Sequence, residues 1–174
     1  MVANGDFNEN PIPSDCADSS VTYAYQCPND WSCSSFVEGC DGLGGIVTVS
    51  SSDTAWGGGG SPSGAYYLSI QATETANAYI SQTIATSGNY ILSFYARSRP
   101  DYPIATQDVY IGDTLLLAQQ PSTAWTKYTL GFSALSSEAL QFVTEGNSDC
   151  DYCAVEIDQV VVIGKFEIDA KLRY

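Results

Sequence analysis

Apolar and polar residues alternate with a period of two along much of this chain. No stretch keeps the i, i+3, i+4, i+7 spacing of an amphipathic helix for three turns, so the pattern predicts strands. Turn residues separate these strands; Gly112-Asp113, for example, stands between two apolar runs as in a two-residue hairpin. Many short strands punctuated in this way favour an all-β sandwich or jelly roll. The expected strands cover residues 45–50, 65–71, 78–85, 89–97, 107–111, 114–118, 125–132, 139–143 and 154–163.

Three other segments complete the predicted domain. Residues 9–44 are rich in Ser, Asp, Asn, Pro and Gly and carry four of the six cysteines. We expect a long loop region held by disulfides, because loops of this length are usually functional or cross-linked. Residues 50–64 contain Trp56 followed by four glycines, and we expect a second loop there. Residues 1–7 have the pattern of the domain's first strand.

The cysteines are predicted to form disulfides. A zinc site commonly uses two close pairs of ligands, whereas this chain has one close pair and no histidine. A redox pair is expected at the start of a helix, whereas the pattern around this pair is that of a strand. Disulfides form in oxidising compartments, so we expect an extracellular protein, secreted or at the cell surface, whose leader is missing from this sequence. The six residues are Cys16, Cys27, Cys33, Cys40, Cys150 and Cys153.

Residues 165–174 follow the point where the sandwich of residues 1–164 is expected to close, near Gly164. We predict an extra amphipathic strand or a linker in this tail. Its three basic and two acidic residues give it a charge of +1, whereas residues 1–164 hold three basic and 18 acidic residues, a charge of −15. The apolar positions of the tail are Phe166, Ile168, Ala170, Leu172 and Tyr174, and between them stand Glu167, Asp169, Lys171 and Arg173.

Charge and composition exclude several classes of function. A net charge of −14 would repel the phosphates of nucleic acids and of anionic membranes, while neutral glycans and divalent cations remain compatible with it. No run approaches the roughly 18 apolar residues of a membrane-spanning helix. The absence of histidine removes the commonest general acid or base and every Ser-His-Asp or Cys-His arrangement. We therefore expect a protein that is not an enzyme.

Several fragments, taken in order over residues 2–163, resemble one group of extracellular proteins. The chain opens with Val-Ala-Asn-Gly-Asp-Phe at residues 2–7 and closes with Ile157-Asp158-Gln159-Val160. Between these stand GAYYLSIQ at 64–71, ISQTI at 80–84, GNYILSFYAR at 88–97 and WTKYT at 125–129. The sequence resembles galactose-binding-like jelly rolls, the extracellular carbohydrate-binding modules and related plant cell-wall proteins. This resemblance implies a jelly-roll β-sandwich that binds a glycan or a cell-wall polysaccharide.

The resemblance also implies a structural calcium ion between the start of the chain and its last strand. The matching positions are Asn8 and Asp158, with Asp6 and Glu9 close enough in sequence to contribute oxygens. Many relatives carry glutamate where this chain has Asn8, so one charged ligand is missing. Calcium takes six to eight oxygen ligands, some of which backbone carbonyls could supply. The alternative is that Asp158 simply hydrogen-bonds to the N-terminal turn.

Candidate sugar-binding residues follow from the alternation, because sugars stack on aromatic rings and bond to planar polar groups. If Leu92, Phe94 and Ala96 face the core, their neighbours face outward, and the strand at 65–71 behaves in the same way. Alternatively, the tyrosines pack across strands, the arginines pair with carboxylates such as Asp101 or Asp108, and the tryptophan covers the end of the sandwich. The candidates are Trp56, Tyr67, Gln71, Tyr95, Arg97, Arg99 and Tyr102.

Two functions remain open from the sequence. The first is a non-catalytic carbohydrate-binding or cell-wall module. The second is a structural subunit of an extracellular filament or surface layer, in which residues 165–174 pair with copies of the same chain. Ordinary alternatives for this tail are an edge strand folded back on its own sheet or a linker to another domain.

Overall fold

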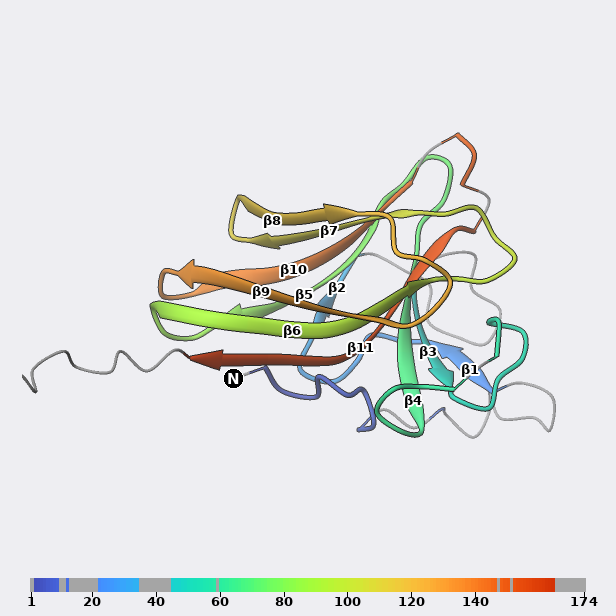
Figure 1. The fold of residues 1–174 in the computed structure, drawn as a ribbon, viewed down its shortest axis with the longest axis horizontal. Helices are drawn as coiled ribbons and strands as arrows, with labels where there is room; N and C mark the ends of the chain where they lie inside the picture. The colour runs from blue at the N-terminus through green and yellow to red at the C-terminus, as the bar shows by residue number, and fades with distance from the viewer. Residues whose placement is uncertain are drawn as a thin grey trace, which may run out of the picture.

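The computed structural model describes residues 2–9, 12, 22–34, 45–58, 60–146, 148–150 and 152–164, and these form a sandwich of two antiparallel sheets (Figure 1). One sheet has six strands in the order β1-β3-β4-β11-β6-β9, and the other has five in the order β2-β5-β10-β7-β8. The strands are β1 Tyr23–Tyr25, β2 Ser32–Cys33, β3 Gly45–Ser50, β4 Tyr66–Gln71, β5 Ala78–Ile84, β6 Gly88–Ser98, β7 Thr106–Ile111, β8 Thr114–Gln119, β9 Thr126–Ala134, β10 Glu138–Glu145 and β11 Ala154–Gly164.

All nine predicted strands are confirmed, with boundaries that shift by at most two residues, and so is the all-β sandwich. The hairpin at Gly112-Asp113 is also confirmed: Ile111 pairs with Thr114, and Gly112 has the positive φ of 52° that such a turn favours. Two short strands, β1 and β2, lie inside the segment predicted as a loop. They form because β1 pairs with β3 and β2 pairs with β5, which are partners distant in sequence.

The prediction of a first strand at residues 1–7 is wrong for the described residues 2–7. Asn4 and Phe7 have positive φ angles of 45° and 56°, so the backbone turns there. The segment is held instead by a hydrogen bond from Val160 N to Gly5 O. A Cβ atom on Gly5 would lie 1.9 Å from Val160 O, so only glycine allows this approach to β11.

The core lies between the sheets and follows the predicted alternation. Leu92, Phe94 and Ala96 of β6 are fully buried in it. The Phe94 ring lies edge-on to Phe142 of the opposite sheet, with centroids 5.1 Å apart. A second buried cluster covers the other face of the six-stranded sheet, where Tyr67 and Trp56 pack with Val47 and Val49.

Disulfides link Cys27 to Cys33 and Cys150 to Cys153. The first closes the β2 region and the second closes the turn before β11. The prediction of disulfides is confirmed for these four cysteines, whose pairing the sequence left open. Cys16, Cys40 and the tail of residues 165–174 lie outside the described residues, so the expectations for them stay predictions. In the described part of the chain, no helix has the length and apolarity needed to cross a membrane.

Candidate functional site

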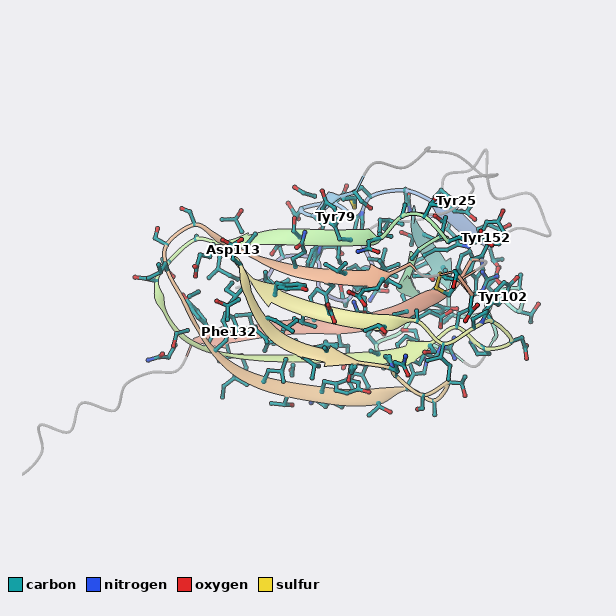
Figure 2. All side chains as sticks on the ribbon, turned by 90° about the horizontal axis from the view of Figure 1, so that it is seen from above. Tyr25, Tyr79, Tyr102, Asp113, Phe132 and Tyr152 are labelled. Atoms are coloured by element: carbon teal, nitrogen blue, oxygen red, sulfur yellow. A yellow bond between two sulfur atoms is a disulfide. The ribbon has the colours of Figure 1, made fainter. Side chains whose placement is uncertain are left out.

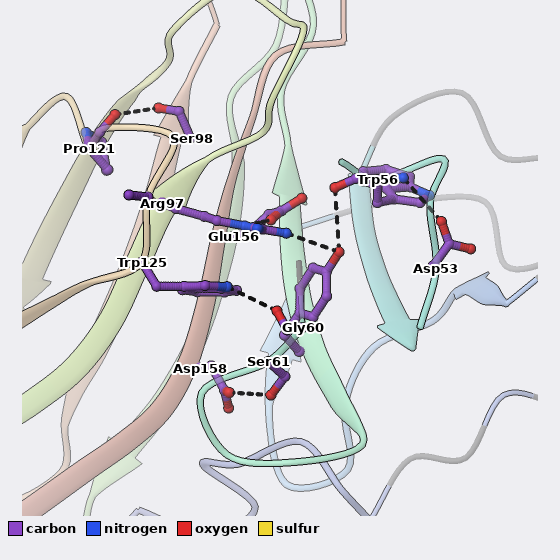
Figure 3. A network of polar contacts seen from close by, with 12 residues as sticks. Asp53, Trp56, Gly60, Ser61, Arg97, Ser98, Pro121, Trp125, Glu156 and Asp158 are labelled. Carbon is purple, nitrogen blue, oxygen red and sulfur yellow. Dashed lines mark hydrogen bonds and ion pairs between the residues drawn. The ribbon is translucent and has the colours of Figure 1, made fainter. Parts of the chain in front are cut away.

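The outer face of the six-stranded sheet carries a buried ion pair. Glu156 of β11 and Arg97 of β6 stand opposite each other in the register, and Arg97 Nε pairs with Glu156 Oε2 (Figure 3). Arg97 Nη2 also donates to the Tyr67 hydroxyl at 3.4 Å, and its guanidinium lies 4.7 Å from the Trp125 ring centroid. Arg97 and Glu156 are 4% and 0% exposed. Arg97 is therefore already engaged by a carboxylate, a hydroxyl and an aromatic ring of the same protein.

The loop of residues 51–65 covers this pair. Trp56 N donates to Asp53 Oδ1 at 3.0 Å, and the Tyr67 hydroxyl donates to the Trp56 carbonyl at 3.4 Å. Trp125 Nε1 donates to the Gly60 carbonyl at 3.0 Å, which fixes the glycine run from the other side (Figure 3). These contacts hold the loop against the sheet and exclude water from the ion pair.

This burial changes the ionisation of the enclosed groups. Loss of hydration raises the pKa of the Glu156 carboxyl to about 7, although the Arg97 charge opposes the change. Burial also raises the pKa of the Tyr67 hydroxyl well above its usual range, and the negative charge of Glu156 adds to this effect. Tyr67 therefore stays a neutral donor and acceptor in the cluster.

Most of the residues predicted to bind sugar lie within this covered region. Tyr95 is partly exposed, with Lys127 Nζ 5.8 Å from its ring centroid. Tyr102 is 37% exposed, but one face of its ring carries the Arg99 guanidinium at 3.7 Å, and Trp56 lies against the same guanidinium at 3.9 Å. The aromatic faces near Arg97 and Arg99 are thus occupied by arginine. The buried members are Trp56 (2% exposed), Tyr67 (1%), Gln71 (2%), Arg97 (4%) and Arg99 (7%).

The outer face of the five-stranded sheet is more accessible. Tyr79 of β5, labelled in Figure 2, is 37% exposed, and Tyr110 of β7 is partly exposed on the same face. The strand between them is β10, on which Gln141 stands opposite both Tyr110 and Ser81. The sequence reasoning missed this face, although the alternation in residues 78–85 and 107–111 places both tyrosines opposite to the core positions.

A carboxylate lies beside one of these rings. Tyr110 donates its hydroxyl proton to Asp108 Oδ2 at 3.0 Å, and this hydrogen bond raises the pKa of Tyr110. Asp108 is 6% exposed, and its Oδ1 has no hydrogen-bond partner. The face therefore combines two aromatic rings with an amide and a fixed hydroxyl, the groups that sugar recognition requires.

The predicted calcium ligands are engaged in other contacts. Asp158 is fully buried and accepts hydrogen bonds from Ser63 Oγ at 2.7 Å and Ser63 N at 2.9 Å. It also accepts bonds from Ser61 Oγ and Gln159 N, both at 2.6 Å. Hydrogen bonds thus satisfy Asp158, but these donors lie in the loop before β4 and in β11, and not in the N-terminal turn that was expected to supply them.

The other two predicted ligands contact each other. Asn8 donates from Nδ2 to Asp6 Oδ2 at 3.1 Å, which leaves Asn8 Oδ1 as a buried oxygen without a partner. In the ranges that the structure describes, no three or more acidic or cysteine side chains gather in a group that could hold a metal ion. Calcium stays a prediction from the resemblance.

Comparisons with known proteins concern the fold. No protein-family model matches the sequence, and no curated protein matches it. Among solved structures, the K1 cleaved adhesin domain of Lys-gingipain from Porphyromonas gingivalis W83 matches with a TM-score of 0.57 at 11% identity, over 80% of this chain and 93% of that one. TmCBM61 in complex with β-1,4-galactotriose matches with 0.54 at 11%, over 79% and 90%. The CBM22-1 xylan-binding domain of Paenibacillus barcinonensis Xyn10C matches with 0.51 at 14%, over 76% and 83%. The chain therefore has the jelly-roll sandwich fold that these carbohydrate-binding modules and adhesin domains share.

Proposed function

We propose that this chain is a non-catalytic, extracellular glycan-binding module that binds sugar on the outer face of its five-stranded sheet. The observation that carries the proposal is the pair of accessible rings, Tyr79 and Tyr110, on one face with Gln141 opposite Tyr110 on the strand between them. β5 and β7 flank β10, so the two strands lie about 10 Å apart, given a spacing of roughly 4.8 Å between neighbours. Two rings at this separation can contact successive parts of one chain-like ligand.

The fold and the chemistry of the chain support this proposal. The structural relatives include modules whose names state that they bind xylan or a galactotriose. The chain contains no histidine, which agrees with a binding role rather than with acid–base catalysis. The disulfides Cys27–Cys33 and Cys150–Cys153 fit an oxidising, extracellular compartment.

The opposite face is the less suitable platform. Tyr67 and Trp56 would have to leave their contacts with Arg97, Arg99 and the 51–65 loop before a sugar could stack on them. Tyr79 and Tyr110 need no such opening. The proposal therefore moves the glycan from the surface expected from the sequence to the other sheet.

A glycan array probed with the full chain, followed by titration calorimetry on any glycan that binds, tests the proposal. We expect Tyr79→Ala and Tyr110→Ala each to weaken binding about tenfold, which corresponds to roughly 1.4 kcal/mol. Tyr110→Phe keeps the ring and removes only the hydrogen bond to Asp108, so its loss should be smaller.

The matched control is Tyr95→Ala, because Tyr95 is a partly exposed tyrosine on the outer face of the other sheet. We expect it to bind as the wild type does. Binding that survives both Tyr79→Ala and Tyr110→Ala but is lost in Tyr95→Ala would place the glycan on the six-stranded sheet. An array with no bound glycan would count against the whole function.

A further inference from the structure

Each sheet of the described sandwich has two end strands, and they differ in length. At one side, β1 has three residues and β2 has two. At the other side, β8 has six residues and β9 has nine. In Figure 1, β8 and β9 both lie toward the viewer, and only residues 120–125 connect them. One side of the sandwich therefore presents two long edges, whose outer N–H and C=O groups have no neighbouring strand in the described sheets.

These edges have only part of the usual protection against strand pairing. β8 has the sequence TLLLAQ, without a charge or a proline, and its pairing with β7 shifts register at Leu116, while β9 carries a single charge at Lys127. The core also reaches the surface here. Leu116 and Leu117 of β8 and Tyr128 and Leu130 of β9 pack against the main core but stay partly exposed. An added strand would complete the cover over these side chains.

The best-matched occupant within this sequence is the tail of residues 165–174. Its ten residues are close in number to the nine of β9, and its five alternating apolar residues would face Tyr128 and Leu130. Its charge of +1 suits a body of charge −15. The tail of the same molecule fits less well, because Gly164 pairs with Tyr90, which in turn pairs with Phe132 of β9.

A tail that paired with its own β9 edge would have to pass β6 and β9 and lie one strand spacing beyond them, a distance of about 14 Å from β11. That path would use roughly four extended residues, including Phe166, before pairing with β9 could begin. The tail of a neighbouring molecule can place all ten residues along β9.

We propose that the β9 edge, together with the exposed core side chains of β8, binds residues 165–174 of a second copy of this chain as an added strand. Each molecule then offers one donor tail and one acceptor edge, so the contact is head-to-tail and builds rings or open chains. Main-chain hydrogen bonds supply much of the affinity, and the apolar alternation sets the register.

The test uses the full chain and two complementary variants, with mass measured by light scattering and sedimentation velocity over a wide concentration range. The donor variant combines Ile168→Asp and Leu172→Asp, and the acceptor variant is Leu130→Lys. We expect oligomers of the wild type, monomers of each variant alone and a one-to-one dimer when the two variants are mixed, because each retains the half that the other lacks. Asp169→Asn, on the polar side of the tail, is the matched control and should assemble as the wild type does.

Three results would overturn the proposal. The first is a wild-type protein that stays monomeric at every concentration, whether or not hydrogen exchange shows that the amides of its tail are protected by folding back on the same molecule. The second is an oligomer that persists in the donor variant, because the tail would then not be the joint. If Leu130→Lys lowers the unfolding temperature markedly, Leu116→Lys on β8 replaces it as the acceptor variant. The third result is that neither acceptor variant forms a dimer with the donor variant, because the β9 edge would then not be the acceptor.

Discussion

Glu156 is the group that we expect to make stability depend on pH near neutrality. It is fully buried against Arg97, and its Oε1 has no hydrogen-bond partner. Burial raises its pKa from 4.5 to about 7. Because the folded pKa lies above the unfolded one, the folded protein retains a proton that the unfolded chain releases between about pH 4.5 and 7. This group therefore stabilises the fold as the pH falls through that window and loses the effect as the pH rises through 7.

A folded pKa of about 7 against an ordinary value of 4.5 corresponds to at most about 3 kcal/mol. Between pH 7.5 and pH 5 the expected gain is about 2 kcal/mol. The assay is urea unfolding of the wild type and of Glu156→Gln at a series of pH values in this range. Glutamine keeps the shape of the side chain and does not titrate, so the difference between the two proteins cancels the shared titration of the other acids.

We expect the unfolding free energy of the wild type to rise relative to the variant as the solution becomes more acidic. A difference that stays constant, or that shrinks on acidification, would mean that Arg97 keeps Glu156 ionised throughout. The reasoning that burial outweighs the ion pair would then be wrong.

Three further predictions concern two loop residues, Gly146 and Asp53, and the calcium ion that the resemblance implies. Gly146→Ala should lower the unfolding free energy by about 1–3 kcal/mol in urea titrations, because the added Cβ would lie 2.1 Å from Thr73 O. Gly164→Ala is the control and should stay within about 0.5 kcal/mol of the wild type, because the nearest atom to its Cβ is 3.7 Å away. Asp53→Ala should cost about 1–3 kcal/mol by the same measurement, because Trp56 N and Thr22 Oγ1 lose their acceptor, and a cost near zero would mean that the loop is held by its other contacts. Removal of calcium with a chelator should leave the unfolding temperature of the wild type unchanged if the hydrogen bonds to Asp158 satisfy it, and a rise on adding calcium would instead support the ion that the resemblance implies.

Local alternation was enough to predict the strands and the direction in which each side chain points. Leu92, Phe94 and Ala96 enter the core and Arg97 leaves it, because the period of two fixes these directions within a strand. Alternation does not say what covers the outward face. Trp56 and Gly60 lie over Arg97 through contacts between segments tens of residues apart, so the burial of the predicted sugar-binding residues could not be read from the sequence.

The short strands β1 and β2 also depend on contacts between segments distant in sequence, which local alternation does not predict. Residues 23–25 form β1 only because they pair with β3, in a segment whose composition is typical of a loop. Tyr79 and Tyr110 are a different case, because their strands were predicted correctly and their outward direction follows from the buried neighbours Ile80 and Val109. The sugar-binding candidates follow from the alternation in residues 65–71 and 89–97, although the same rule holds for residues 78–85 and 107–111.

The proposed glycan face and the proposed assembly edge lie on different parts of the molecule, so their effects can be separated. Tyr79 and Tyr110 point outward from the five-stranded sheet, whereas β9 ends the six-stranded one. The donor variant with Ile168→Asp and Leu172→Asp should therefore bind a short soluble glycan as tightly as the wild type in calorimetry. On an immobilised polysaccharide it should dissociate at least about a hundredfold faster, because linked modules rebind at high effective concentration and a single module does not. Equal dissociation of the two proteins from the polysaccharide would show that any assembly through the tail adds nothing to glycan binding, and weaker binding of the short glycan would show that the two regions are coupled.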